Sequence, residues 1–161
     1  MCVFSVKVRG MSDNLIFMMG EFEAEFPADL MYAKNHMWAK PSGDVARFGF
    51  SAYAVRLLQD VYFLDWTVEA PADFSVGQEI GSIESKKAES SLYAPGSGRL
   101  LELNEALLED PSAINTDKYQ TGWLFEMMAT SVELLTAEEY LVLLESVWSK
   151  TQRTIKGQLN E

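Results

Sequence analysis

The sequence predicts a mainly β protein, a flattened barrel or sandwich of short strands with short helices added to it. Three observations support this prediction. Short β-prone runs recur along the chain with turn residues between them, helical patterns are few, and a hairpin within residues 81–98 displays two lysines at its tip. No period typical of a tandem-repeat protein is visible.

The 161 residues are enough for one domain with its own core. Cys2 is the single cysteine, so no disulfide can form within the chain, and a reducing cytosol is the natural compartment. No apolar run is long enough to span a bilayer, and the run over 15–19 is too short for a signal peptide. We therefore expect a cytoplasmic protein.

The chain is strongly acidic, with 24 Asp and Glu against 13 Lys and Arg and a formal net charge of −11. A nucleic-acid binder needs a basic face for phosphates, and anionic membranes attract basic segments, so we expect neither kind of partner. Acidity suits a carrier that docks on basic surfaces of partner proteins. The same acidity could simply keep the protein soluble. Composition leaves both explanations open.

The first thirty residues have weaker patterns. A loose alternation over 3–8 fits an edge strand, and the apolar run over 15–19 is expected to cover part of the core or a partner. Pro27 favours a single helical turn over 26–30, because proline is well tolerated in the first position of a helix.

The middle of the chain is dominated by strands. Ser51 is expected to cap a short helix over 52–59, with Ala54, Leu57 and Leu58 on its apolar face. A second short helix near 105–108 is expected to precede a loop through 113–121. The strands are expected at 32–40 with Trp38 packed inward, at 45–50, 61–68 and 99–103, and at 123–129.

The lysine hairpin pairs two short strands, over 78–84 and 90–94, across a polar run of turn length, 85–88. A lysine on a tight hairpin suits covalent attachment, because its amine is a nucleophile on a flexible stem that a modifying enzyme can reach. A solvated turn explains the same lysine pair. Gly81 and Gly98 are expected to serve backbone needs of the hairpin and of the turn after it.

A long helix is expected over 136–156. Thr136 and Glu139 form a capping box at its start, and Gly157 is a plausible stop. This helix is expected to pack on the sheet or to offer its face to a partner. The residues on its apolar face are Tyr140, Leu144, Val147, Trp148, Thr151 and Ile155.

The sequence contains no catalytic or metal-binding constellation. His36 is the single histidine and has no cysteine near it, and the glycines at 96–98 lack the context of a phosphate-binding loop. We therefore expect no catalytic residue and no metal ligand. An attached cofactor would have to supply any bond chemistry.

The hairpin sequence ESKKAES, over 84–90, resembles the lipoyl-lysine region of the glycine cleavage system H proteins. The resemblance runs from about Tyr32 to about Met127. Further motifs of that family follow in the same order: YAKNHMW at 32–38, GFSAYA at 49–54, LYAP and SG within 92–98, NEAL at 104–107, NTDKY at 115–119 and GWL at 122–124.

The resemblance implies the barrel-sandwich hybrid fold of lipoyl carriers and assigns roles to three residues. Lys87 occupies the position of the lipoyl-lysine, although Lys86 stands where the family usually has a small apolar residue. Glu84, three residues earlier, resembles the acidic residue that lipoate-attaching enzymes read; a solvated hairpin charge is the plain alternative. His36 is expected to line the groove that holds the loaded arm, or simply to be a packed or surface histidine.

The resemblance also implies a function. Lipoic acid, joined to Lys87 by an amide, would carry the aminomethyl group of glycine between glycine decarboxylase, aminomethyltransferase and dihydrolipoamide dehydrogenase, after attachment by a lipoate ligase or octanoyltransferase. The chain would be a carrier and not an enzyme, and we expect a monomer. Residues 27–130 would form the lipoyl-carrier domain, 1–26 an N-terminal extension, and 131–161 a C-terminal helical extension packed on the same domain.

Three other functions compete with the role of a lipoyl carrier in glycine cleavage. H-like proteins carry sulfur in a heterodisulfide-reductase-like oxidation pathway, and the segment 26–32, the C-terminal helix and Met37, where glycine-cleavage proteins usually have Glu, leave that role open. An unmodified acidic binding module on the same fold is the second. Biotin carriers share the fold, but their lysine lies between methionines, whereas Lys86 and Ala88 flank Lys87.

Overall fold

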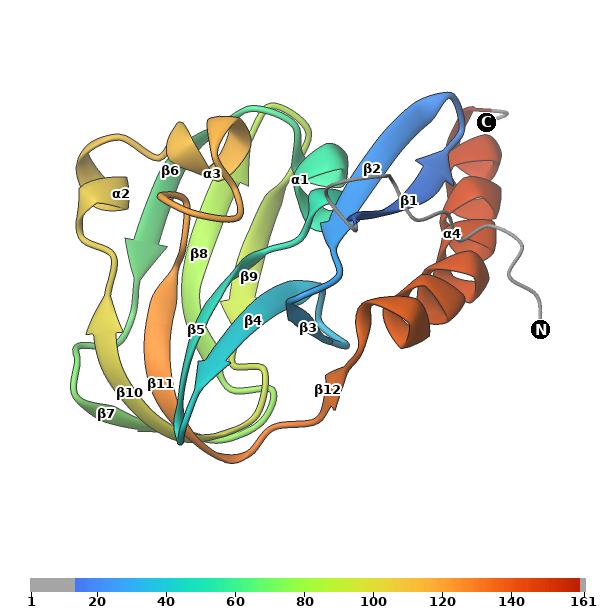
Figure 1. Ribbon diagram of the computed structural model, residues 1–161. Coiled ribbons are helices and arrows are strands. Elements are labelled where there is room, and N and C mark those ends of the chain that lie inside the picture. The colour runs from blue at the N-terminus through green and yellow to red at the C-terminus, as the bar shows by residue number, and fades with distance from the viewer. Residues whose placement is uncertain (1–13, 160–161) are drawn as a thin grey trace.

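The computed structural model describes residues 14–159, with side chains described for residues 14–150. It is mainly β, as the sequence predicts (Figure 1). The strands are β1 (Asn14–Met19), β2 (Phe22–Pro27), β3 (Met31–Ala33), β4 (Met37–Ser42), β5 (Val45–Phe50), β6 (Val61–Trp66), β7 (Ala72–Phe74), β8 (Glu79–Ser85), β9 (Glu89–Tyr93), β10 (Ser97–Leu103), β11 (Phe125–Ser131) and β12 (Leu134–Leu135). The helices are α1 (Ala52–Leu58), α2 (Ala106–Glu109), α3 (Ala113–Thr116) and α4 (Ala137–Leu159).

Two sheets enclose the main core. The larger has the strand order β12-β3-β4-β5-β11-β10-β7, and the smaller has the order β6-β8-β9. Phe48 of β5 and Phe125 of β11 stack with ring centroids 5.4 Å apart, and Leu64 of β6 and Ile83 of β8 belong to the same buried cluster. Burial of these apolar side chains between the sheets is the main force that holds the sandwich together.

A second core joins the two ends of the described chain. The hairpin β1–β2 and helix α4 lie together at one side of the molecule, away from β6 and α2 (Figure 1). Tyr32 of β3 and Tyr140 of α4 stack with centroids 4.7 Å apart, and Phe26 of β2 meets both rings edge-on. Leu15, Phe17 and Met19 belong to this core. Of the two roles predicted for the apolar run at 15–19, covering a core or covering a partner, the first is confirmed.

Several local predictions are confirmed. The strand over 45–50 is β5, and Trp38 is buried. The capping box of α4 is present: the Thr136 N–H donates to Glu139 Oε1 over 2.9 Å, and the Glu139 N–H donates to Thr136 Oγ1 over 3.1 Å. Gly81 meets a backbone requirement, as predicted. It lets β8 approach β6 closely, because a Cβ at this position would clash with the Asp65 carbonyl oxygen.

Two predictions near the N-terminus are wrong. The strand expected over 32–40 is divided into β3 and β4, because His36 between them takes a left-handed conformation with φ of 71°. Residues 26–30, all described, form no helix; β2 extends to Pro27 and a turn follows it. The edge strand expected over 3–8 lies outside the described residues.

Helix details also differ from the predictions. Ser51 precedes α1 but makes no side-chain cap, because its hydroxyl hydrogen-bonds Tyr140 instead. Val55 is buried in α1 and Leu57 is exposed. Helix α3 lies within the expected loop at 113–121, and α4 continues past Gly157. The difference at Ser51 comes from packing against α4, a segment far away in the sequence.

Candidate functional site

The candidate site is the tip of the β8–β9 hairpin. The two strands pair in register up to Glu84 and Glu89, and β8 is the central strand of its sheet. Lys86, Lys87 and Ala88 at the tip are exposed. The sheet therefore gives the two predicted lysines a rigid base and leaves both side chains in solvent.

Ser85 fixes the shape of the tip. Its backbone N–H donates to the Ala88 carbonyl over 2.8 Å. Its hydroxyl oxygen accepts from the N–H groups of Lys87 and Ala88 over 3.3 and 3.2 Å, and lies 3.2 Å from the Ala88 carbonyl, to which it donates. Sequence reasoning missed this residue, and its only signal was a hydroxyl at the first position of the turn.

A second bond anchors the tip to the body of the protein. The Lys86 N–H donates to the Asp60 carbonyl, in the connection between α1 and β6, over 2.8 Å. The backbone of Lys86 is thus tied to a neighbouring segment, while that of Lys87 is held only within the turn. Lys87 is the lysine at the freer position.

Glu84 lies beside the tip on β8 and is partly buried. In the register of the sheet it stands between Phe63 of β6 and Glu89 of β9. Side chains directly opposite each other on neighbouring strands share a face of the sheet. Since Leu64 and Ile83 face the core, the row that contains Glu84 faces solvent.

His36 lies in a polar cluster between the two cores. Its Nδ1 is 2.8 Å from the Tyr140 hydroxyl, which is also 2.8 Å from the Ser51 hydroxyl. The Tyr53 ring lies against it, with centroids 4.7 Å apart. Burial lowers the pKa of His36 from 6.5 to about 4, so the imidazole is neutral at pH 7.

A cavity of about 330 Å³, called here the hairpin pocket, brings His36 and the hairpin together. Among its lining residues, all in the described part of the chain, none is an Asp, Glu, Lys or Arg. Glu84, Lys86 and Lys87 are not part of the lining. The lining includes Asn35, His36, Ala54, Leu58, Ile83 and Ala88.

Asn35, at the edge of the hairpin pocket, has a buried and unsatisfied acceptor. Its Nδ2 donates to the Tyr93 carbonyl over 3.0 Å, whereas its Oδ1 is buried and lacks a hydrogen-bond partner among the described residues. A buried acceptor without a donor is costly, and the atom is closed to water. The local sequence pattern indicates no separate role for Asn35.

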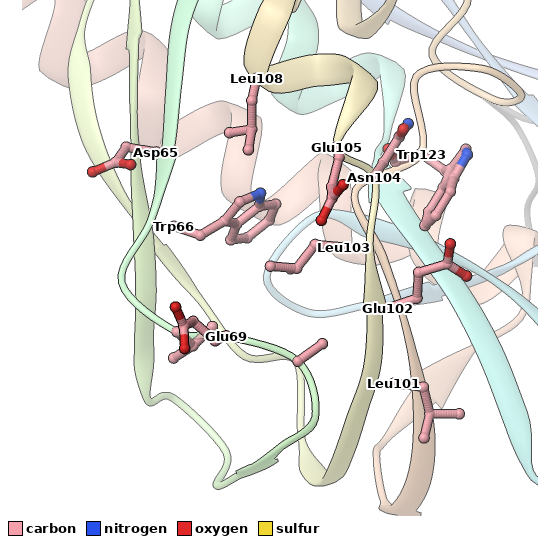
Figure 2. Close-up of a pocket in the computed structure, with 12 residues that line it drawn as sticks. Asp65, Trp66, Glu69, Leu101, Glu102, Leu103, Asn104, Glu105, Leu108 and Trp123 are labelled. Carbon is pink, nitrogen blue, oxygen red and sulfur yellow. The ribbon is translucent and has the colours of Figure 1, made fainter.

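A larger cavity of about 680 Å³ lies elsewhere and has a different character (Figure 2). Trp66 and Trp123 lie on two sides of it, and the carboxylates of Glu69, Glu102 and Glu105 gather around it. Neither His36 nor any residue of the hairpin tip lines this larger cavity. Its acidic lining separates it from the uncharged hairpin pocket, so we do not include it in the candidate site.

The described residues contain neither a metal-binding cluster nor a membrane-spanning helix. Within 14–150, no group of three or more His, Cys, Asp and Glu side chains is arranged to hold a metal ion. No helix in the described part of the chain is long and apolar enough to cross a bilayer.

Comparison with known proteins identifies the family. A family model described as "Glycine cleavage H-protein" matches residues 30–148. The glycine cleavage system H protein of Rubrobacter xylanophilus is 41% identical over 123 residues, which are 76% of this chain and 97% of that protein. The corresponding protein of Picosynechococcus sp. is 40% identical over 124 residues, covering 73% of this chain and 93% of its own length.

The solved structures give the same result. The crystal structure of a glycine cleavage system H protein from Mycobacterium marinum is similar with a TM-score of 0.65 and 39% identity, covering 71% of this chain and 95% of that one. The family model, the relatives and the fold agree, and the chain belongs to the glycine cleavage H-protein family.

Proposed function

We propose that Lys87 carries a lipoyl group in amide linkage and that the chain is the lipoyl carrier of a glycine cleavage system. The observation that supports this most strongly is the placement of Lys87 on a rigid hairpin, exposed, next to an uncharged pocket that His36 and Ala88 line. The protein would act as a carrier and not as an enzyme, within residues 27–130. Residues 1–26 and 131–161 would be additions to that domain.

The hairpin pocket suits such an arm. Lipoate supplies a disulfide that opens when it accepts a group and closes again by two-electron oxidation. Apolar side chains such as Leu58 and Ile83 would shield a hydrocarbon arm from water, and neutral His36 adds no charge.

The implied partners are enzymes. Glycine decarboxylase would load the aminomethyl group, aminomethyltransferase would remove it, and dihydrolipoamide dehydrogenase would reoxidise the dithiol. A lipoate ligase or octanoyltransferase would attach the arm first. The net charge of −11 favours docking on basic surfaces of these enzymes, and the tether raises the effective concentration of the arm at each docked active site.

The relatives give no support to the sulfur-carrier role or to the unmodified binding module, because they are named as H proteins of glycine cleavage. The glycine role is therefore the one proposed. Met37 remains a local departure from the residue usual in that family.

The test is the intact mass of the protein after co-expression with a lipoate-attaching enzyme and lipoate. We expect a shift of one lipoyl group in the wild type and in Lys86→Arg, and no shift in Lys87→Arg. The modified protein should then support exchange of glycine carboxyl carbon with bicarbonate by glycine decarboxylase. An unshifted wild type, under conditions that modify a control H protein, would contradict the carrier role.

A further inference from the structure

Two aromatic side chains lie exposed next to the lysine hairpin. On β6, Tyr62 retains 62% and Phe63 45% of the accessible surface of the free residue. The register between β6 and β8 shifts between Val61 and Phe63. A bulge of this kind turns two consecutive side chains to the same side of a strand, which explains why both aromatic rings meet solvent while Val61 and Leu64 are buried.

These rings lie on the face of the sheet that holds Glu84. Phe63 is directly opposite Glu84 in the register, so the two side chains are neighbours. The start of β6 is also tied to the hairpin tip, because the Asp60 carbonyl accepts the Lys86 N–H. Tyr62, Phe63 and Glu84 thus form one surface, called here the aromatic patch, that borders the tip bearing Lys87.

We propose that the aromatic patch is the docking surface for the enzyme that attaches the lipoyl group to Lys87. This inference rests on the proposed function. Exposed aromatic side chains beside a charged group are typical of the residues that dominate binding energy in protein interfaces. The glutamate gives the patch its polar contact, and the two rings give it apolar area.

The geometry of the reaction selects this enzyme among the partners. Attachment by a ligase is an acyl transfer from lipoyl-adenylate: the amine of Lys87 forms an amide bond with the lipoyl carbonyl, the bond between that carbonyl and the phosphate oxygen breaks so that AMP leaves, and the amine loses a proton. The attaching enzyme must therefore reach Nζ itself and cover the residues around the tip. The glycine cleavage enzymes act at the far end of the arm and can dock further away.

The test is the rate of lipoylation of the full chain by a purified lipoate ligase with ATP and lipoate, followed by intact mass. In the double variant Tyr62→Ser, Phe63→Ser we expect kcat/KM to fall about tenfold or more, mainly through KM. The pair Tyr62→Phe, Phe63→Tyr keeps the rings and should keep the rate. Val142→Ser, which removes an exposed apolar side chain on α4, is the matched control.

Two further readouts separate a docking role from a structural one. The double variant should keep the melting temperature of the wild type, and once lipoylated to completion it should support the glycine decarboxylase reaction at the wild-type rate. Lipoylation within twofold of the wild type would overturn the proposal. An equal loss in the decarboxylase reaction would also overturn it, because the patch would then serve partners in general. A wild type that takes up no lipoyl group would contradict the proposed function itself.

Discussion

The backbone N–H of Lys86 donates a 2.8 Å hydrogen bond to the backbone carbonyl of Asp60. This bond ties one of two adjacent, exposed lysines to the connection between α1 and β6, and leaves Lys87 at the freer position of the turn. Ser85 completes the arrangement from inside the hairpin. The tip is therefore a rigid support for Lys87, and its rigidity can be tested.

Substitution of Ser85 by Ala should loosen the tip. The variant loses the acceptor for the Lys87 and Ala88 N–H groups, and we expect a loss of about 1 kcal/mol in the free energy of unfolding and a slower lipoylation of Lys87. Urea unfolding and the lipoylation rate measure the two effects. Ser90→Ala removes only one exposed bond and is the control; equal rates in the two variants would argue against a role for tip geometry.

The partly buried His36 should make the free energy of unfolding depend on pH. Burial lowers the pKa of His36 to about 4 in the folded protein, whereas the ordinary value of 6.5 applies to the unfolded chain. Between these two values the unfolded chain binds a proton that the folded protein does not. The contribution of His36 to the free energy of unfolding is fully present above pH 6.5 and is lost as the pH falls toward about 4. The free energy of unfolding should change by at most about 1.4 kcal/mol per pH unit from this group. Urea unfolding across this range should show that slope in the wild type.

His36→Asn is the matched variant for that titration. Asn tolerates the left-handed backbone at this position and does not titrate, so the variant should lack this part of the slope and keep the part due to carboxylates. Identical pH profiles for the two proteins would show that His36 titrates normally.

Tyr140→Phe should destabilise the junction of the two cores. The hydroxyl of Tyr140 hydrogen-bonds both His36 Nδ1 and the Ser51 hydroxyl. Its removal leaves both of these groups without that partner. We expect a loss of about 1–3 kcal/mol in the free energy of unfolding, measured in urea. Tyr32→Phe removes a single bond to the Pro27 carbonyl and should cost less; the reverse order would contradict this account.

Filling the hairpin pocket should expose the arm. Ala54 lines the pocket from α1, and Ala54→Phe would occupy part of the space available to a lipoyl arm. After reduction, the dithiol of the lipoylated variant should react faster with iodoacetamide than that of the wild type. Val142→Phe, on α4 and outside the pocket lining, is the control. Equal alkylation rates in all three proteins would show that the arm does not use this pocket.

Features that depend on neighbouring residues could be predicted from the sequence. The lysine hairpin, the strand over 45–50 and the capping box of Thr136 and Glu139 follow from local alternation, turn residues and a side chain that satisfies the first N–H groups of a helix. The motif around Lys87, together with the further motifs in the same order from about Tyr32 to about Met127, was sufficient to place the chain in its family.

Features that depend on residues far apart in the sequence could not be predicted and are seen only in the fold. Ser51 was predicted to cap α1, but its hydroxyl bonds Tyr140, which is 89 residues further along the chain. His36 and Ala88 share a pocket only because the turn before β4, helix α1 and the β8–β9 hairpin meet around it. Phe63 lies beside Glu84 only because a bulge sets the register of β6. Periodicity in one segment cannot specify which other segment will cover it, so register and burial between segments appear only in the folded protein.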